Sequence, residues 1–130
     1  MKESDIYKNL KKLWPYYIER IEPKYKGGIP DVLVEKNGGG ACFIELKLFE
    51  IQKNGKVKIK IRPSQYIWFK QYTGRALLLA WNGETHYVFE KENVQLIRNG
   101  IQNKNFKELA SINYDNVKFV SHWIRTFISS

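Results

Sequence analysis

The spacing of apolar residues changes along the chain, and each spacing predicts a different element. From residue 5 to residue 14 the apolar positions follow a helical period, and Pro15 then interrupts the pattern. We therefore predict a short amphipathic helix there. From residue 16 to residue 22 the side chains alternate, which favours a strand. The apolar positions of the helix are Ile6, Leu10, Leu13 and Trp14.

A β-hairpin is predicted next along the chain. Residues 32–34 are Val-Leu-Val and suit a strand, whereas residues 37–40 are Asn-Gly-Gly-Gly and suit a turn. Residues 41–48 then form a second run of mostly apolar side chains. The two runs and the turn between them predict a pair of antiparallel strands.

Three charged side chains belong to this hairpin. Glu45 and Lys47 are two residues apart, so in a strand they share one face, about 6 to 7 Å apart, while Leu46 points to the other face. Thirteen residues separate Asp31 from Glu45, which is enough for the hairpin to return the chain to Asp31. We therefore predict that two carboxylates and one ammonium group converge.

A second hairpin is predicted over residues 48–62. Residues 48–53 lead into the turn Asn54-Gly55, and residues 56–62 return with a strict alternation of polar and apolar side chains. One face of the returning strand carries four cations, which are Lys56, Lys58, Lys60 and Arg62. Two interpretations stay open. The face is either a solvated edge that lysines protect from aggregation or an arm that contacts the phosphates of a nucleic acid.

The rest of the chain alternates helix with strand. Pro63 opens a helix that runs to about Tyr72, and residues 75–81 and 85–90 predict two strands joined at Asn82-Gly83. The other helix-prone segments are residues 92–98, 106–109 and 117–128. This order of elements predicts an α/β fold, a mixed central β-sheet flanked by α-helices in a single domain.

Composition narrows the classes of function. The 130 residues hold no apolar run of about 18 residues and no signal-peptide pattern, so we predict an intracellular, cytoplasmic protein with no membrane partner. Cys42 is the single cysteine, which excludes an internal disulfide and predicts a small buried thiol within a strand. A net charge of +9 favours an anionic partner such as nucleic acid.

The charged residues of the first hairpin suit phosphodiester hydrolysis. That reaction needs an in-line water and stabilisation of the charge on phosphate, and a divalent metal supplies most of this help. Asp31, Glu45 and the backbone carbonyl of Leu46 offer hard oxygen ligands, which favour Mg²⁺ or Mn²⁺. Lys47 would lie beside the ion, where it offsets phosphorane charge or helps to deprotonate the water.

Three short motifs resemble those of a known family. They are Gly28-Ile29-Pro30-Asp31, Phe43-Ile44-Glu45-Leu46-Lys47, and Arg62-Pro63-Ser64-Gln65 with Trp68 just beyond. Together they resemble the PD-(D/E)xK nucleases, and within these most closely the small stand-alone VRR-NUC domains of bacteriophages. The resemblance spans roughly residues 27–81. The chain departs from the family in lacking the Val-Arg-Arg tripeptide, for part of which Arg20 is a substitute.

The resemblance implies a restriction-endonuclease-like fold and a role for each motif residue. Asp31 and Glu45 would be metal ligands, Lys47 the catalytic lysine and Gln65 a supporting residue of the site. The implied activity is a metal-dependent DNA endonuclease. The implied partner is DNA, branched DNA such as a Holliday junction included, and the resemblance also allows a homodimer.

A further acidic ligand is implied near the first helix. The family places a glutamate there that reaches the metals. Glu3 is the first candidate because it precedes the predicted helix, and Glu19 and Glu22 are its rivals in the next segment. The number of metals, one or two, depends on which of them serves.

The same residues also permit simpler interpretations and two other functions. Asp31 after a proline is ordinary turn chemistry, and Glu45 with Lys47 can form a solvent-facing ion pair. His86 and His122 lack a ligand-spaced partner, so we predict structural roles for both. A non-catalytic DNA-binding module that retains the nuclease fold and uses the cationic face is one alternative. A protein-interaction factor that uses the aromatic residues of the last helix, Trp123 and Phe127 among them, is another.

Overall fold

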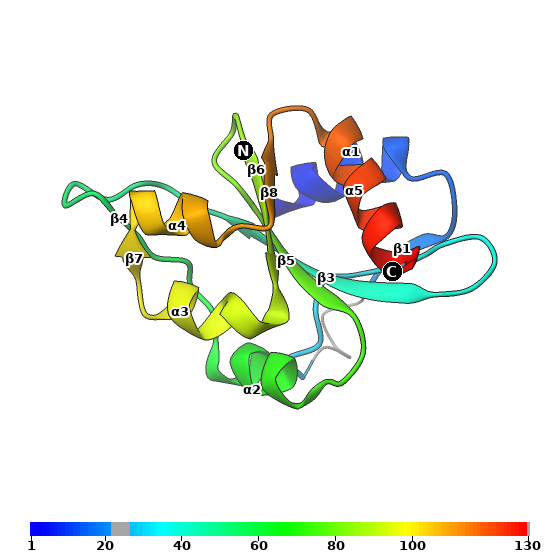
Figure 1. Ribbon diagram of the computed structural model, residues 1–130, viewed down its shortest axis with the longest axis horizontal. Coiled ribbons are helices and arrows are strands. Elements are labelled where there is room, and N and C mark those ends of the chain that lie inside the picture. The colour runs from blue at the N-terminus through cyan, green and yellow to red at the C-terminus, as the bar shows by residue number, and fades with distance from the viewer. Residues whose placement is uncertain (22–26, 130) are drawn as a thin grey trace.

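A mixed sheet of six strands forms the centre of the described part of the chain. The computed structural model describes residues 1–21 and 27–129 (Figure 1). The strands β3 and β5 are parallel, and every other neighbouring pair in this sheet is antiparallel. In sheet order the strands are β1 (Ile18–Arg20), β2 (Val32–Glu35), β3 (Ala41–Leu48), β5 (Ala76–Trp81), β6 (His86–Glu90) and β8 (Ile112–Tyr114).

Two helices, α1 (Glu3–Leu13) and α5 (Val117–Ser129), cover one face of this sheet. The apolar stripe of α1 buries Ile6 and Leu10, and that of α5 buries Val120 and Ile124. Both stripes pack against alternate residues of the strands, which are Val32, Val34, Cys42, Ile44, Leu46, Leu77, Leu79 and Val88. The helical periods predicted at residues 5–14 and 117–128 are therefore confirmed, although α1 begins earlier and includes Glu3.

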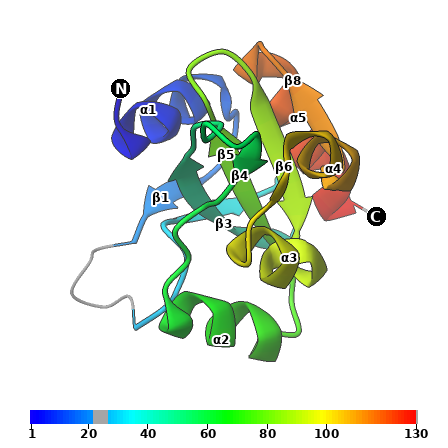
Figure 2. The same cartoon turned by 90° about the vertical axis from the view of Figure 1, so that its left-hand side faces the viewer.

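Three helices lie on the opposite face (Figures 1 and 2). They are α2 (Pro63–Gln71), α3 (Val94–Arg98), which follows the 3₁₀ turn η2 (Lys91–Asn93), and α4 (Asn103–Leu109). Their buried side chains include Phe69, Ile97 and Phe106, which meet the other set of strand residues, Leu78 and Phe89 among them. An α/β fold with a mixed sheet flanked by helices is thus confirmed.

The first predicted hairpin forms as expected from its sequence. In β2 and β3 the partners are Val32 with Ile44, Leu33 with Phe43, and so on to Glu35 with Ala41. If this register is continued by one residue, Asp31 lies opposite Glu45. Because residues that face each other across a ladder share one side of the sheet, the two carboxylates belong to the same face, which is the face covered by α2.

The second predicted hairpin is confirmed only around its turn. The chain reverses at Asn54-Gly55, where the N–H of Gln52 donates to the carbonyl of Lys56 and an isolated antiparallel bridge joins Ile51 to Val57. The long returning strand does not form, because β4 (Lys56–Val57) has two residues and its ladder partner is β7 (Ile101–Gln102) in a separate two-stranded sheet. The polar and apolar alternation is still real. The apolar residues Val57, Ile59 and Ile61 are buried in the core beneath α2, α3 and α4, and the alternating cations are exposed. Burial against helices, rather than pairing in a ribbon, explains the alternation.

Smaller differences concern element boundaries. The strand predicted over residues 16–22 is confirmed only for Ile18–Arg20, and residue 22 lies outside the described residues. The edge strand β8 was not predicted, because Ile112–Tyr114 is a three-residue strand with two exposed positions. Cys42 is buried, as predicted. Within residues 1–21 and 27–129, no helix combines the length and apolar character that crossing a membrane requires.

Candidate functional site

Asp31 and Glu45 are two buried carboxylates at the junction of β2 and β3. Their exposed fractions are 9% and 2%. The Oδ2 atom of Asp31 accepts a hydrogen bond of 3.0 Å from the backbone N–H of Leu46. This bond lies just beyond Val32 and Ile44, the last residue pair of the β2–β3 ladder. The Asp31 side chain therefore continues the pairing to β3 where the backbone ladder ends. The interpretation of Asp31 as a plain turn residue does not account for this burial.

Gln65 joins the elements of the site. Its Nε2 donates to Glu45 Oε2 at 2.9 Å, while its Oε1 accepts from Lys47 Nζ at 3.2 Å and from the backbone N–H of Arg62 at 2.9 Å. The bond from the Arg62 N–H caps the first turn of α2. Pro63, the first residue of the helix, has no backbone N–H that would need a partner. Gln65 is 2% exposed, so this amide connects the start of α2 to the centre of the sheet. It is not a water-facing residue of the first turn.

Lys47 pairs with Glu45 inside the protein rather than at its surface. The Nζ atom lies 3.3 Å from Glu45 Oε2, and the two side chains are 12% and 2% exposed. A buried carboxylate needs a compensating charge or hydrogen bonds, and Glu45 receives both from Lys47 and Gln65. A solvent-facing ion pair on a half-exposed strand is therefore the wrong description of these two residues.

The loop before Asp31 is held against the start of α2. Gly28 has φ of +94°, and a Cβ atom built on it would lie 2.4 Å from the backbone oxygen of Ser64. Only glycine permits both this backbone conformation and this approach. The contact fixes the path of the chain that delivers Asp31 to the site, and it does so on the same helix turn that carries Gln65.

These side chains border a hollow of about 330 Å³. Its described lining is Glu3, Asp31, Glu45, Lys47, Leu48, Lys60, Arg62 and Gln65. Glu3 reaches it from the first turn of α1, and the exposed Lys60 and Arg62 reach it from the segment before α2. Lys56 and Lys58 are exposed but lie outside this described lining. The predicted cationic face is thus divided, and only its second half reaches the site.

The oxygen donors of the site fit a hard divalent cation. The N–H of Leu46 points toward Asp31, whereas the N–H of Phe43 points toward β5 and donates to Arg75. Because the N–H and C=O of one strand residue point to the same side, the carbonyl of Leu46 also faces Asp31. Two carboxylates that border the hollow and a carbonyl that faces Asp31 suit Mg²⁺ or Mn²⁺, since such ions retain water and use few protein carboxylates.

The further acidic ligand is not brought into that cluster. Among the described residues, no group of three or more His, Cys, Asp or Glu side chains is arranged to hold a metal ion. Glu3 borders the hollow, whereas Glu19 is exposed on β1 and accepts a hydrogen bond of 2.7 Å from the Tyr17 hydroxyl. Glu22 lies outside the described residues. Of the two candidates within the described residues, Glu3 is the one that borders the hollow together with the two carboxylates.

Neither histidine is among the described residues that border the hollow. His86 is 4% exposed, stacks on Trp81, and its Nδ1 lies 3.1 Å from the carbonyl of Tyr114. Burial lowers the pKa of His86, so the ring is neutral at pH 7. His122 is exposed on α5. Packing and sheet-edge contacts account for His86.

Sequence reasoning missed what the glutamine does. The motif resemblance named Gln65 but could not show that one amide bonds Glu45, Lys47 and the backbone of Arg62. A signal was present, because Pro63 at the first helical position puts Gln65 at the third, where a capping side chain turns back.

Comparisons with protein-family models, with curated proteins and with solved structures gave no match for this chain. The functional interpretation of the site therefore depends on its own geometry and chemistry.

Proposed function

We propose that this protein is a divalent-metal-dependent DNA endonuclease that hydrolyses phosphodiester bonds. One observation carries the proposal. Asp31, Glu45, Lys47 and Gln65 converge through hydrogen bonds and an ion pair beside a hollow that Lys60 and Arg62 also border. Buried acidic, basic and amide groups gathered at a surface hollow are a typical arrangement for catalysis, and the cations favour a phosphate-bearing substrate.

The metal would be held by Asp31, Glu45 and the Leu46 carbonyl. When bound, Mg²⁺ or Mn²⁺ would supply Lewis-acid stabilisation of phosphate charge and a more acidic water. Lys47 contributes a fixed positive charge next to these oxygens, in a setting that is 12% exposed and so screens charge less than water does. Gln65 keeps Glu45 and Lys47 at fixed positions, because its amide bonds both.

Arg62 and Lys60 have a different task from the buried residues. Both side chains are exposed and both border the hollow. They suit contacts with the phosphates on either side of the bond that is cut, which position DNA without reading its sequence. A narrower form of the same proposal is that the enzyme selects branched DNA, such as a Holliday junction.

A second candidate function is a non-catalytic DNA-binding module with the same fold. The observation in its favour is the row of exposed cations from Lys56 to Arg62, whose alternate neighbours are buried and so hold the row in place. Such a module would bind with an affinity that falls steeply with salt and does not depend on Asp31 or Glu45.

The two candidates are separated by one cleavage screen. The protein would be incubated with Mg²⁺ or Mn²⁺ and with a four-way junction, a flap, a duplex and a single strand of DNA. We expect cleavage of at least one substrate, and a loss of at least about 100-fold in rate for Glu45→Gln and for Lys47→Met. Absence of cleavage on every substrate, together with salt-dependent binding, would favour the module.

Matched controls test whether removing a charge at a position outside the hollow also slows cleavage. Glu50→Gln and Lys53→Met change an exposed carboxylate and an exposed ammonium on the segment that follows β3. Neither residue is in the described lining of the hollow. Cleavage by both controls should equal that of the unchanged protein, and circular dichroism should show that all four variants are folded.

A further inference from the structure

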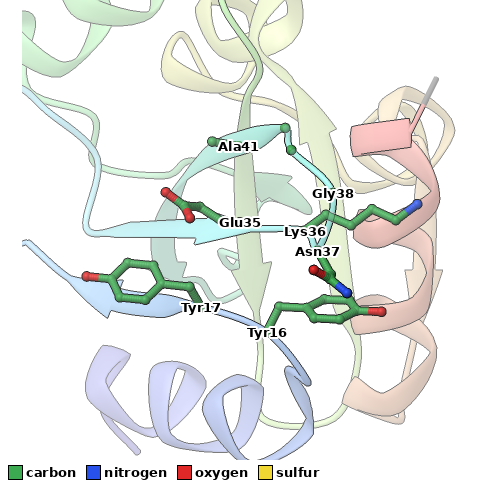
Figure 3. Close-up of a pocket in the computed structure, with 9 residues that line it drawn as sticks. Tyr16, Tyr17, Glu35, Lys36, Asn37, Gly38 and Ala41 are labelled. Atoms are coloured by element: carbon green, nitrogen blue, oxygen red, sulfur yellow. The ribbon is translucent and has the colours of Figure 1, made fainter.

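A second, larger hollow lies at the far end of β2 from the candidate site. It measures about 530 Å³ and is lined by Tyr16, Tyr17 and the hairpin from Glu35 to Ala41 (Figure 3). Two adjacent tyrosines stand at its side, with exposed fractions of 39% and 51%. No described atom lies within 4 Å of a Cβ built on Gly38 or Gly39, so the hairpin tip leaves this space open.

Tyr17 and Glu35 lie on the same side of β2 as the candidate site. The N–H of Glu35 donates to the carbonyl of Tyr17 at 2.9 Å, so these residues continue the ladder between β1 and β2. Glu35 is four residues from Asp31, and side chains in a strand repeat their face every second residue. In Figure 3 both side chains extend toward the end at which β2 begins, whereas Tyr16 and Asn37 lie toward the hairpin tip.

The exposed Tyr17 ring has a defined hydrogen bond. Its hydroxyl donates to Glu19 Oε2 at 2.7 Å, which raises the pKa of Tyr17 and keeps the phenol protonated. Its backbone is held by Glu35, whose own carbonyl accepts from the indole N–H of Trp14 at 3.0 Å. An exposed aromatic ring offers an apolar face on which a flat ligand can stack.

The side chains between the two hollows are apolar and only partly exposed. On the face shared by Asp31 and Glu35, the residues between them are Leu33 and its ladder partner Phe43, both half-buried, and the Phe43 ring packs against Trp68 and Tyr72. Glu35 itself would repel a phosphate, but a carboxylate accepts hydrogen bonds from the exocyclic amines of cytosine or adenine. The distance along β2 from Asp31 to Glu35 is about 13 Å, a length that a few nucleotides can cover.

We propose that Tyr17 and Glu35 form a base-binding site for a single-stranded DNA segment that flanks the position cut at Asp31 and Glu45. The ring of Tyr17 stacks on one base, and Glu35 accepts a hydrogen bond from its exocyclic amine. This inference rests on the proposed action on DNA. It narrows the substrate to DNA that carries a single-stranded flank beside a duplex.

The test is a thermodynamic cycle measured by fluorescence anisotropy in EDTA, so that no DNA is cut. The ligands are a labelled duplex with a single-stranded cytosine flank and the same duplex with abasic flank residues. Tyr17→Ala should weaken binding of the cytosine flank between about 5-fold and 100-fold and leave binding of the abasic flank unchanged. Equal effects of the variant on both ligands would overturn the inference.

Two further variants control for ring and exposure. Tyr17→Phe keeps the ring and should bind the flank within about twofold of the unchanged protein, because stacking does not need the hydroxyl. Phe119→Ala removes a ring of matched exposure, 52% against 51%, on α5, and should leave binding unchanged. A loss of flank binding in Phe119→Ala as large as that in Tyr17→Ala would also contradict the proposal.

A measurement on the unchanged protein covers the case in which Tyr17→Ala does not fold. A flank that carries 5-iododeoxyuridine would be crosslinked by light and the attached peptide identified by mass spectrometry. Attachment within residues 16–17 or 35–41 supports the site, and attachment elsewhere only would refute it. If no substrate is cleaved but Tyr17→Ala weakens binding of the cytosine flank alone, the proposed nuclease activity is wrong and this binding site stands. If DNA is cleaved but Tyr17→Ala affects both ligands equally, the nuclease activity stands and this binding site is wrong.

Discussion

Gly28→Ala is the substitution whose effect the structure defines most closely. Gly28 has φ of +94°, and the added methyl carbon would lie 2.4 Å from the oxygen and 2.8 Å from the carbonyl carbon of Ser64. Both Ser64 atoms belong to the backbone of the first turn of α2, which is capped through Gln65. Neither can move away as the end of a flexible side chain would.

The expected cost has two parts. Placing an L residue in the left-handed region costs about 1 to 2 kcal/mol. Relieving the contact with Ser64 requires a shift of the loop or of α2, and such overpacking typically costs about 1 to 3 kcal/mol. We therefore expect Gly28→Ala to lower the free energy of unfolding by about 2 to 5 kcal/mol.

Gly38→Ala is the matched control for this experiment. Gly38 has nearly the same φ, +91°, but no described atom lies within 4 Å of the Cβ built on it. Gly38→Ala should therefore lower the free energy of unfolding only by the backbone cost, about 1 to 2 kcal/mol. Urea unfolding followed by circular dichroism measures both variants. Equal losses for the two would refute the claim that the loop before Asp31 is pressed against α2.

The remaining predictions concern single side chains. Lys91 donates to the carbonyls of Tyr72 and Gly74 at 2.7 and 2.6 Å. Thermal unfolding should therefore show that Lys91→Met lowers the free energy of unfolding by about 1.5 to 3 kcal/mol. Lys70→Met, on the exposed side of α2, should leave it almost unchanged. Burial raises the pKa of Cys42 to about 12, so a thiol reagent should label the protein only after unfolding; rapid labelling of folded protein would contradict this. Burial holds the pKa of His86 below 6.5, so just below pH 6.5 the unfolded chain binds a proton that the folded protein does not. The free energy of unfolding should therefore fall as the pH is lowered below 6.5, and His86→Phe should show a smaller fall in urea titrations at several pH values.

Local patterns were enough to predict the elements that hold the site. Val-Leu-Val, a glycine-rich turn and a returning apolar run specify a hairpin with few alternatives, and the observed register is the one that puts Asp31 opposite Glu45. The spacing of Glu45 and Lys47 then puts both on one face. These features depend on neighbours in the chain, and the hairpin and the shared face can therefore be deduced without the rest of the fold.

The sequence alone misjudged the segment from residue 56 to residue 62. Its alternation fits a ribbon with a solvated face, but alternation records only that one side of an extended segment is covered. What covers Val57, Ile59 and Ile61 is a core to which the helices between residues 63 and 109 contribute Phe69, Ile97 and Phe106, and no pattern within residues 56–62 identifies these partners. For the same reason β8 was missed, since a short edge strand is stabilised by its partner β6 rather than by its own residues.

The sequence by itself determined which chemical groups this protein has at the candidate site and which face of a strand they share, because strand periodicity is a local property. Only the tertiary structure decided that Gln65 bonds Glu45 of β3 and that the loop at Gly28 lies against α2. It also decided which charged residues reach the hollow: Glu3, Lys60 and Arg62 border it, while Lys56 and Lys58 lie outside its described lining. Those placements depend on how α1 and α2 pack on opposite faces of the sheet. Packing of that kind is set by the summed burial of many distant side chains, which no short motif contains.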